Sequence, residues 1–448
     1  MIEERELRDA LRRRADAVGS MPIGPTVAVR RARRRLAMTA SVSLITVAAL
    51  VAGVVIGVAR LTVAHRPVPA SEPAQWTRVQ LDQSAAMSGA DPHAVAAGPS
   101  GYVAVGDISM ATSGTGPQDP NLRAPNYQRF LGKTSSVAHT PVWTSPDWTH
   151  WTPVPPAGAP DSLGLGNVAY GHGLFVTVGN TGSLYDANPP DNAAWFSSDG
   201  VSWTQATIHA PDHPAWAPIR LFDVMATNFG FLVSGAIGDN GFVWQSADGR
   251  VWDPVSNESV FGGSTFRQQV QTLALGGPGY LAFGGEWRSD AGLGATPLLW
   301  TSTDGTSWTR QTFDPNPLPF EAIDGGVTTD GPRLVAAGEA GSTASTAAAV
   351  VWTSTDGVTW TRQDFPSSSY LFTVTYADGR YFIGGDGGIW TSGDGLAWTH
   401  VPDPNGAFTP DTSAFARQGA YVEAFADGPN GLIATGTVGL DGTVWVGR

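Results

Sequence analysis

The sequence predicts an all-β protein, a seven-bladed β-propeller, from three repeated features of its 448 residues. Two Trp residues eight positions apart, with an Asp midway between them, occur six times. A run of four mostly apolar residues that ends in Gly occurs seven times. The repeat region begins with a strand that has no hairpin partner and ends in a unit that lacks its last strand. The composition agrees, because 55 Gly, 33 Pro and only 15% charged residues favour short strands joined by turns.

Each Trp pair indicates a β-hairpin that forms the third and fourth strands of a unit. Ser stands two residues before each Asp, and Gly follows the Asp in five hairpins, with Trp148 in its place in the first. Taking residues 303–305 as a three-residue loop, we expect Trp300 to face Trp308 across the hairpin. Gly305 should adopt the left-handed conformation, which Gly takes without a steric penalty. These hairpin bends, which we call the aspartate turns, are centred on Asp147, Asp199, Asp248, Asp304, Asp356 and Asp394.

The runs that end in Gly indicate the second strand of each unit, so that a unit reads strand, turn, strand, loop, strand, aspartate turn, strand. In the last unit Trp445 occupies the third-strand position, whereas residues 75–81 match the fourth strands of other units. We therefore expect Trp76 to lie beside the strand of Trp445 and to close the ring, which hides the edges of a linear stack. The runs end at Gly106, Gly179, Gly235, Gly284, Gly338, Gly385 and Gly436.

The repeated Ser-x-Asp-Gly-x-x-Trp hairpin resembles the Asp-box, or bacterial neuraminidase repeat, of the sialidase-like propellers, over roughly residues 71–448. It resembles a shortened form, because Asp and Gly are adjacent and the aromatic residue follows the Asp by four positions. The resemblance implies that the six Asp residues are structural and lie at the periphery of the blades. It does not extend to sialidase chemistry, since no Arg-Ile-Pro stretch occurs. No motif places together the arginines Arg123, Arg129, Arg220, Arg267 and Arg288.

The N-terminal residues predict a membrane anchor. Residues 1–36 carry ten Arg against five acidic residues, and residues 37–59 carry no charge over a length that can cross a ~30 Å hydrocarbon core. Clustered Arg residues keep their side of the membrane in the cytoplasm. We therefore expect a cytoplasmic segment over 1–36, a single transmembrane helix over 37–59, a linker over 60–73 and an extracytoplasmic propeller over 74–448. The alternative is a signal peptide that is cleaved after residue 70.

The composition also limits the classes of partner and cofactor that we expect. The net charge is −13 and no basic patch follows residue 66, so we expect no nucleic-acid partner. The chain has no Cys, and its stability therefore depends on packing without disulfides. A single Lys, Lys133, among 26 basic residues indicates a GC-rich, bacterial genome. No motif for a metal, a phosphate or a dinucleotide occurs, so no cofactor and no metal are expected, and the oligomeric state stays open.

The long connecting segments should gather on one face. In a propeller the loops between second and third strands, and the connectors between blades, emerge opposite the aspartate turns, on what we call the long-loop face. The longest are residues 107–141, 181–192, 286–297, 155–166, 209–218 and 403–419. Loops on a rigid scaffold commonly carry binding residues, although permissive surface growth is the alternative. The candidate binding residues are Arg123, Tyr127, Arg129, His209, Asp212 and His213, for which a solvated polar loop is the competing interpretation.

These features favour a membrane-anchored, extracytoplasmic module that binds a glycan, peptide or protein partner on the long-loop face without catalysis. The alternative is an exo-acting, sialidase-like glycoside hydrolase on the same fold, because Asp is abundant and the separation of two carboxyl groups cannot be read from a sequence. No catalytic residue can be assigned. A third hypothesis is a signalling protein whose N-terminal segment reports on the propeller.

Overall fold

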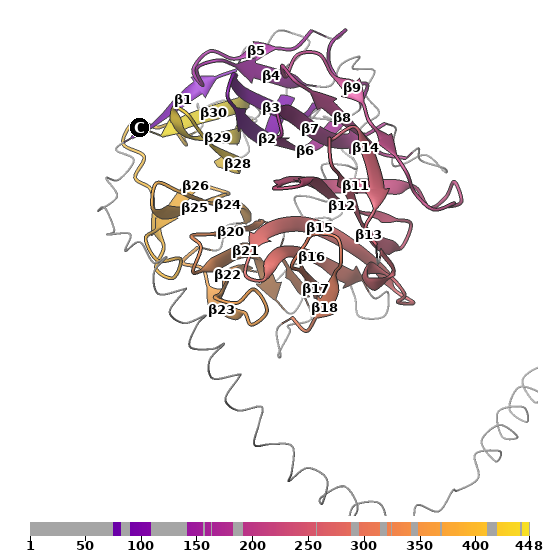
Figure 1. Cartoon of the computed structure of the whole chain (residues 1–448). Helices are drawn as coiled ribbons and strands as arrows, with labels where there is room; N and C mark the ends of the chain where they lie inside the picture. Colours follow the sequence, from indigo (N-terminus) through magenta and orange to yellow (C-terminus); the bar gives the residue numbers. More distant parts are fainter. Residues whose placement is uncertain are drawn as a thin grey trace, which may run out of the picture. The chain divides into compact units, whose positions relative to one another are not determined.

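The computed structural model describes residues 75–81, 90–108, 141–155, 157–162, 164–181, 191–256, 258–287, 295–313, 320–323, 325–341, 348–367, 370–409, 419–439 and 441–447. All of them belong to one compact unit, Pro69–Arg448. Within it, the described residues form seven sheets around a common centre, with an end strand of each sheet nearest the centre (Figure 1). The predicted seven-bladed β-propeller is therefore confirmed.

Each blade follows the predicted order of strands. Blades 1 and 2 contain β2 (Ala90–Gly98), β3 (Gly101–Ile108), β4 (Val142–Ser145) and β5 (Thr152–Pro153), then β6 (Gly164–Gly171), β7 (Leu174–Asn180), β8 (Ala193–Ser197) and β9 (Thr204–Gln205). Blades 3 and 4 contain β11 (Ile219–Thr227), β12 (Gly230–Ile237), β13 (Asn240–Ser246) and β14 (Val251–Pro254), then β15 (Arg267–Gly276), β16 (Gly279–Trp287), β17 (Ala295–Ser302) and β18 (Thr309–Gln311). Blades 5 and 6 contain β19 (Phe320–Ala322), β20 (Val327–Thr329), β21 (Leu334–Gly341), β22 (Ala348–Ser354) and β23 (Thr361–Asp364), then β24 (Leu371–Ala377), β25 (Arg380–Gly385), β26 (Gly388–Ser392) and β27 (Thr399–His400). Blade 7 contains β28 (Ala420–Gly428), β29 (Gly431–Val438), β30 (Asp441–Gly447) and β1 (Trp76–Gln80).

Three elements depart from the simple repeat. A short strand, β10 (Thr207–Ile208), pairs in parallel with the outer strand β14 of blade 3. In blade 5 the inner strand is divided into β19 and β20, which both pair with β21. A single turn of 3-10 helix, η2 (Glu258–Phe261), precedes blade 4. These departures lie in or beside the segments that connect blades, where the repeat pattern constrains the chain least.

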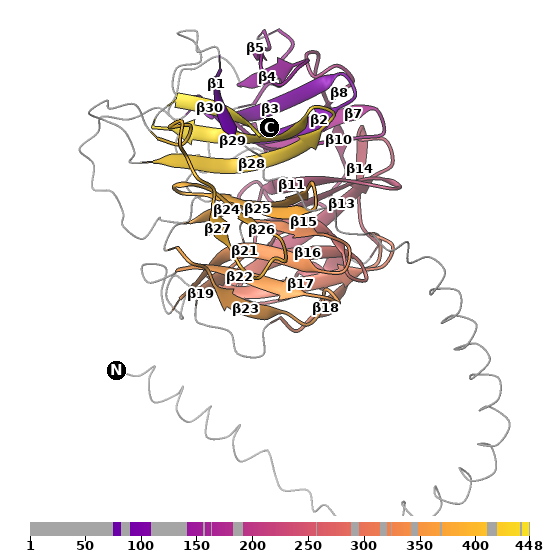
Figure 2. The ribbon, with the colours of Figure 1, turned by 90° about the vertical axis from the view of Figure 1, so that its left-hand side faces the viewer.

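The ring is closed as the sequence predicts, by the first strand pairing with the last. β1 runs antiparallel to β30 over five residue pairs, with Arg78 opposite Trp445 (Figure 2). Trp76 is 4% exposed, and its indole ring lies 6.3–6.4 Å from the rings of Phe382, Phe408 and Phe425. The fourth strand of the last blade thus also fills the interface between blades 6 and 7.

The aspartate turns are longer than predicted, and the expected pairing of Trp300 with Trp308 is wrong. Trp300 lies opposite Arg310, and the last pair before the bend is Thr301 with Thr309. The cause is the carboxylate of Asp304, which accepts hydrogen bonds from the backbone amides of Thr306 and Ser307, both at 2.8 Å. Those bonds keep the chain bent beyond the glycine. The glycine prediction holds, with φ near +75° at Gly200, Gly249, Gly305, Gly357 and Gly395, while Trp148 takes φ 67° in the first turn.

In four of the six aspartate turns the second Trp of the pair folds back over its own turn instead of joining the strand. The indole N–H of Trp308 donates to the carbonyl oxygen of Gly305 at 3.0 Å, and three other turns have the same bond. A Phe from the preceding connector lies between the two indoles: Phe261 is 5.3 Å from Trp300 and 5.8 Å from Trp308, ring centre to ring centre. Phe313, Phe365 and Phe408 do the same for blades 5, 6 and 7. In these four blades the paired Trp residues therefore share one layer between blades, although a third ring separates them.

In six of the seven blades the Gly that ends the apolar run of the second strand lies opposite a β-bulge in the inner strand. Gly284 pairs with Val270, after which the register shifts, and a Cβ atom on Gly284 would collide with the carbonyl oxygen of Gln269. The same arrangement holds for Gly106, Gly179, Gly235, Gly385 and Gly436. A bulge leaves one or more residues unpaired and re-aims their side chains. The repeated glycines therefore make room for the bend that turns inner-strand side chains toward the centre.

The aspartate turns should give the protein an acid-sensitive stability. Backbone hydrogen bonds, that of Ser307 first and that of Thr306 second, lower the pKa of Asp304 to about 2, below its ordinary value of 3.8. A lowered folded-state pKa stabilises the fold above the unfolded pKa, and this contribution is lost as pH falls from about 4 toward 2. Asp304→Asn is therefore expected to reduce the free energy of unfolding at pH 7 by about 0.5–1 kcal/mol, a small value because the turn is exposed. It should reduce it by less at pH 3, and urea unfolding at the two pH values measures both effects.

Asp239→Asn is the matched control, because Asp239 is an Asp outside the aspartate turns. It should leave both unfolding free energies within about 0.5 kcal/mol of those of the unchanged protein. An equal loss for Asp304→Asn at pH 7 and pH 3 would show that the carboxylate charge does not stabilise the turn.

The predicted anchor, residues 37–59, lies outside the described residues and stays a prediction. Among the residues that the structure does describe, no helix is both long enough and apolar enough to cross a membrane.

Candidate functional site

The carboxylates of the aspartate turns are already engaged in hydrogen bonds within their own turns. Each of the six carboxylates accepts hydrogen bonds from two backbone amides of its own turn. These bonds lower the pKa of the Asp residues, which therefore stay ionised and engaged at neutral pH. A carboxylate held in this way is a poor proton donor and a poor nucleophile. A ligand site is therefore expected on the opposite, long-loop face.

On the long-loop face, the loop of blade 2 and the connector to blade 3 meet at the start of β11. The carboxylate of Asp191 accepts a 2.8 Å hydrogen bond from the backbone amide of Ile219, and the amide of Asn192 donates to the carbonyl oxygen of Ile219 at 2.9 Å. His213 braces the connector: its Nε2 lies 3.0 Å from Asp191 Oδ1 and its Nδ1 lies 3.0 Å from the carbonyl oxygen of Pro211. The Pro211 contact and then the Asp191 carboxylate raise the pKa of His213.

The braced connector holds a Trp out into solvent. Trp216 is 69% exposed, although its neighbours Ala217 and Ile219 are buried at 6% and 4%. Most Trp side chains of the described residues are buried between blades. An indole that is exposed beside buried neighbours is therefore unusual in this protein and is a candidate contact surface for a ligand. The exposed ring and the His213–Asp191 pair together make this corner of the long-loop face the first part of the candidate site.

The predicted site residues are only partly brought together. His209 bonds through Nδ1 to the carboxylate of Asp253 on β14 at 2.6 Å, whereas His213 bonds to Asp191. The two imidazoles thus bond to different carboxylates and form no shared metal site. Asp212 is exposed beside His213, and its charge is among the causes that raise the pKa of His213. The remaining candidates, Arg123, Tyr127 and Arg129, lie outside the described residues.

Two of the five arginines that the sequence analysis names, Arg220 and Arg267, lie within the described ranges. Arg267, at the start of β15, places its guanidinium 4.8 Å from the ring centre of Trp287 on the neighbouring strand, a cation–π contact within one blade. Arg220 stands near the start of β11, in the adjacent blade. Arg123, Arg129 and Arg288 lie outside the described residues.

The inner-strand bulges carry polar residues that sequence reasoning missed. The bulge of β11 presents Asp223, whose carboxylate accepts a bond from the side-chain amide of Asn167 in blade 2 and one of 2.8 Å from the backbone amide of Leu273 in blade 4. Burial raises the pKa of Asp223. One carboxylate thereby joins three successive blades at the centre of the ring. The sequence carries one signal of this bulge, since an apolar run ends at Gly235, beside the register shift in β11.

The bulges of β2 and β28 bring together a second polar group, Asp91, His93 and Glu423, which we call the central cluster. One ring nitrogen of His93 and one carboxylate oxygen each of Asp91 and Glu423 lie within 4.8 Å of one another. All three residues are buried, at 7%, 8% and 7% exposure. A compact set of two carboxylates and an imidazole at the centre of a propeller has the donor types of an acid–base pair or a cation site.

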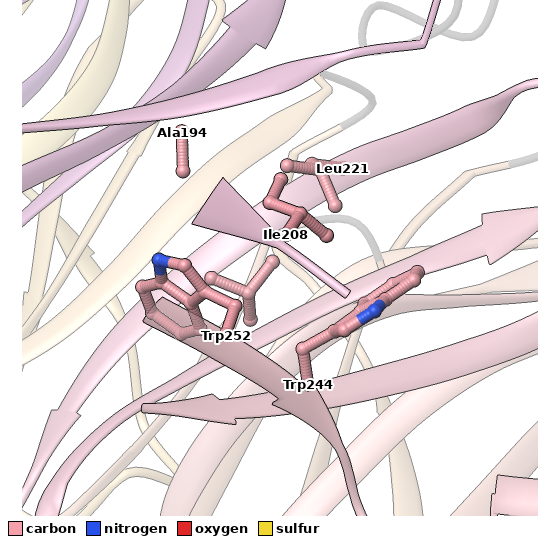
Figure 3. Close-up of a pocket in the computed structure, with 6 residues that line it drawn as sticks. Ala194, Ile208, Leu221, Trp244 and Trp252 are labelled. Carbon is pink, nitrogen blue, oxygen red and sulfur yellow. The ribbon is translucent and has the colours of Figure 1, made fainter. Parts of the chain in front are cut away.

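A small apolar pocket lies between blades 2 and 3 and is a packing gap, not a ligand site. Ala194, Ile208, Leu221, Val233, Trp244 and Trp252 line it (Figure 3). It leaves no room for a water molecule. Without polar groups to orient a ligand, such a gap is an ordinary imperfection of the core.

Comparison with known proteins does not identify a family for this chain. Neither the protein-family models nor the curated proteins gave a match, so the resemblance to the Asp-box family is not confirmed. Among solved structures, the chain is similar to YCF48 from Cyanidioschyzon merolae, with a TM-score of 0.47 and 13% identity over 83% of this chain and 98% of that one. It is also similar to a mutant of an α-L-arabinofuranosidase from Fusarium graminearum in complex with an iminosugar inhibitor (TM-score 0.40, 14% identity, 61% of this chain and 89% of that one). A third is the α-L-arabinanase of Penicillium chrysogenum with arabinobiose (TM-score 0.39, 14% identity, 61% of this chain and 90% of that one).

Proposed function

We propose that the protein is a non-catalytic binding module whose ligand contacts the long-loop face beside Trp216. The observation that supports this proposal is the exposure of the Trp216 indole on a connector that His213 and Asp191 hold in place. A rigid aromatic ring with exposed faces gives contact area at a small entropic cost. The exposed carboxylates of Asp191 and Asp212 on the same face can accept directional hydrogen bonds, as ligand sites require.

A glycan is the ligand class that best fits this pairing. The C–H face of a sugar ring can stack on an indole, while its hydroxyl groups can donate to the exposed carboxylates of Asp191 and Asp212. A peptide or protein partner would use the same ring as an apolar anchor. The extracytoplasmic tether through residues 37–59 is part of the same proposal, although the binding site does not depend on it.

The second candidate function, an exo-acting glycoside hydrolase, is favoured only by the carboxylates of the central cluster. Asp91 and Glu423 offer oxygens within 4.8 Å of each other. Inverting glycosidases separate their two carboxyl groups by about 6.5–9.5 Å and retaining ones by about 5–5.5 Å. Both residues are also 7% exposed, so a sugar would have to displace packed side chains to reach them. The pair is too buried for this chemistry, which favours the binding module.

Trp216→Ala is expected to weaken binding of the recognised glycan at least tenfold, because the stacking surface is removed. The measurement is a glycan array with the purified full-length protein, scored for bound and for cleaved glycans, followed by titration of the best ligand. Leu396→Ala is the matched control, since Leu396 is 41% exposed on the aspartate-turn face. Glycans that bind equally well to the Trp216→Ala protein would contradict the proposed site, and glycans that are cleaved would support the hydrolase instead.

A further inference from the structure

The central cluster stands at the seam where the two ends of the ring meet. Asp91 and His93 come from β2 of blade 1, and Glu423 comes from β28 of blade 7. In each strand the register shifts at these residues, between Asp91 and Ala94 and between Val422 and Ala424. Two independent bulges therefore converge on one point, and the three ligand-type atoms lie within 4.8 Å of one another as a result.

The backbone of blade 2 holds one ring nitrogen of His93. Its Nε2 lies 2.5 Å from the carbonyl oxygen of Leu165. A carbonyl oxygen only accepts hydrogen bonds, so Nε2 carries the proton and the lone pair of the neutral imidazole is on Nδ1. Metal-binding histidines commonly have their second nitrogen held by a carbonyl or carboxylate in this way, which fixes the tautomer and the ring.

Asp91 supplies a second, independent observation. Its Oδ1 atom is buried and accepts no hydrogen bond from any residue in the described ranges, and the residue as a whole is only 7% exposed. A buried carboxylate oxygen without a donor is unfavourable unless a cation or a water molecule satisfies it. A divalent cation would satisfy this oxygen.

We propose that the central cluster binds a divalent transition-metal ion of the Zn²⁺ type. One imidazole nitrogen with two carboxylate oxygens is a donor set that Zn²⁺ accepts, whereas Ca²⁺ takes six to eight oxygen ligands. Three protein ligands leave one tetrahedral position for water or another ligand. The bound ion would join β2 to β28 and so fasten blade 1 to blade 7. The sequence analysis expected no metal, because the three ligands come from distant segments and match no motif.

The test is zinc retention by the full-length protein. The protein is treated with EDTA, dialysed against ZnCl₂ and then against buffer, and its zinc is measured by mass spectrometry. We expect about one zinc per chain, and a rise in thermal midpoint of roughly 2–5 °C with excess ZnCl₂ that EDTA reverses. Glu423→Gln and Asp91→Asn keep the side-chain shape and remove an anionic ligand, so each should weaken zinc binding at least tenfold. His93→Ala should do the same.

His150→Ala is the matched control. His150 also pairs with a carboxylate, that of Asp147 at 2.7 Å, but both groups are exposed on the aspartate-turn face. This variant should retain one zinc per chain. Zinc at background level in the unchanged protein would overturn the proposal, as would full zinc retention by the folded Glu423→Gln and Asp91→Asn proteins. Displacement of zinc by an equal concentration of CaCl₂ would overturn the assignment to a transition metal.

Discussion

Trp76→Ala is expected to reduce the free energy of unfolding by about 3–5 kcal/mol, the usual cost of truncating a buried Trp. Trp76 is 4% exposed and touches the rings of Phe382, Phe408 and Phe425, which belong to three different segments. It is also the first residue of the strand that closes the ring. Loss of this side chain should therefore loosen the β1–β30 pairing as well as the core. Urea denaturation followed by Trp fluorescence and by circular dichroism measures the effect.

The control for this substitution is Trp216→Ala, which makes the same chemical change at a side chain that is 69% exposed. It should leave the free energy of unfolding within about 0.5 kcal/mol of the original value. If Trp76→Ala and Trp216→Ala destabilise the protein equally, closure by β1 contributes little to stability, and the other interfaces between blades hold the ring together.

Blade number and ring closure were predictable because they follow from counting. The repeated runs ending in Gly fix the number of second strands, and the unpaired segment at residues 75–81 has only one incomplete unit to join. The register of the aspartate turns was not predictable in this way. A spacing of eight between Trp300 and Trp308 is compatible with a three-residue loop, and also with the observed longer bend. Whether the three-residue loop or the longer bend forms depends on two backbone amide hydrogen bonds to Asp304, which the sequence does not reveal.

The candidate site was less predictable than the fold, for a physical reason. Trp216 looks in the sequence like the many Trp residues that are buried between blades, and its exposure depends on how His213 and Asp191 brace the connector. The central cluster joins residues more than 300 positions apart, and it exists because two bulges turn their side chains toward the centre. In the sequence, the repeated Gly marks only the end of an apolar run that predicts a strand. Its steric role is to leave space for the bulge in the opposite strand, and this role can be recognised only when the pairing of the strands is known.

Gly284→Ala is expected to destabilise the protein by about 3 kcal/mol, the upper end of the cost of overpacking a core. An added Cβ at Gly284 would collide with the carbonyl oxygen and carbon of Gln269, which are backbone atoms that cannot move aside alone. Gly284 shows no positive φ, so the cost would come from the collision and not from backbone conformation. The bulge between Val270 and Thr272 would have to flatten or shift. Thermal and urea unfolding measure the loss of stability.

Gly393→Ala is the comparison that isolates the collision. Gly393 is exposed in an aspartate turn, a Cβ there would meet nothing within 4 Å, and its φ is not positive. Adding a methyl group at such a site stabilises a protein by about 0.4–1 kcal/mol, because the unfolded chain loses freedom. The two identical substitutions should thus change stability in opposite directions. A stable Gly284→Ala protein would mean that the inner strands can shift freely, and that the bulges do not hold Asp223 and the central cluster in place.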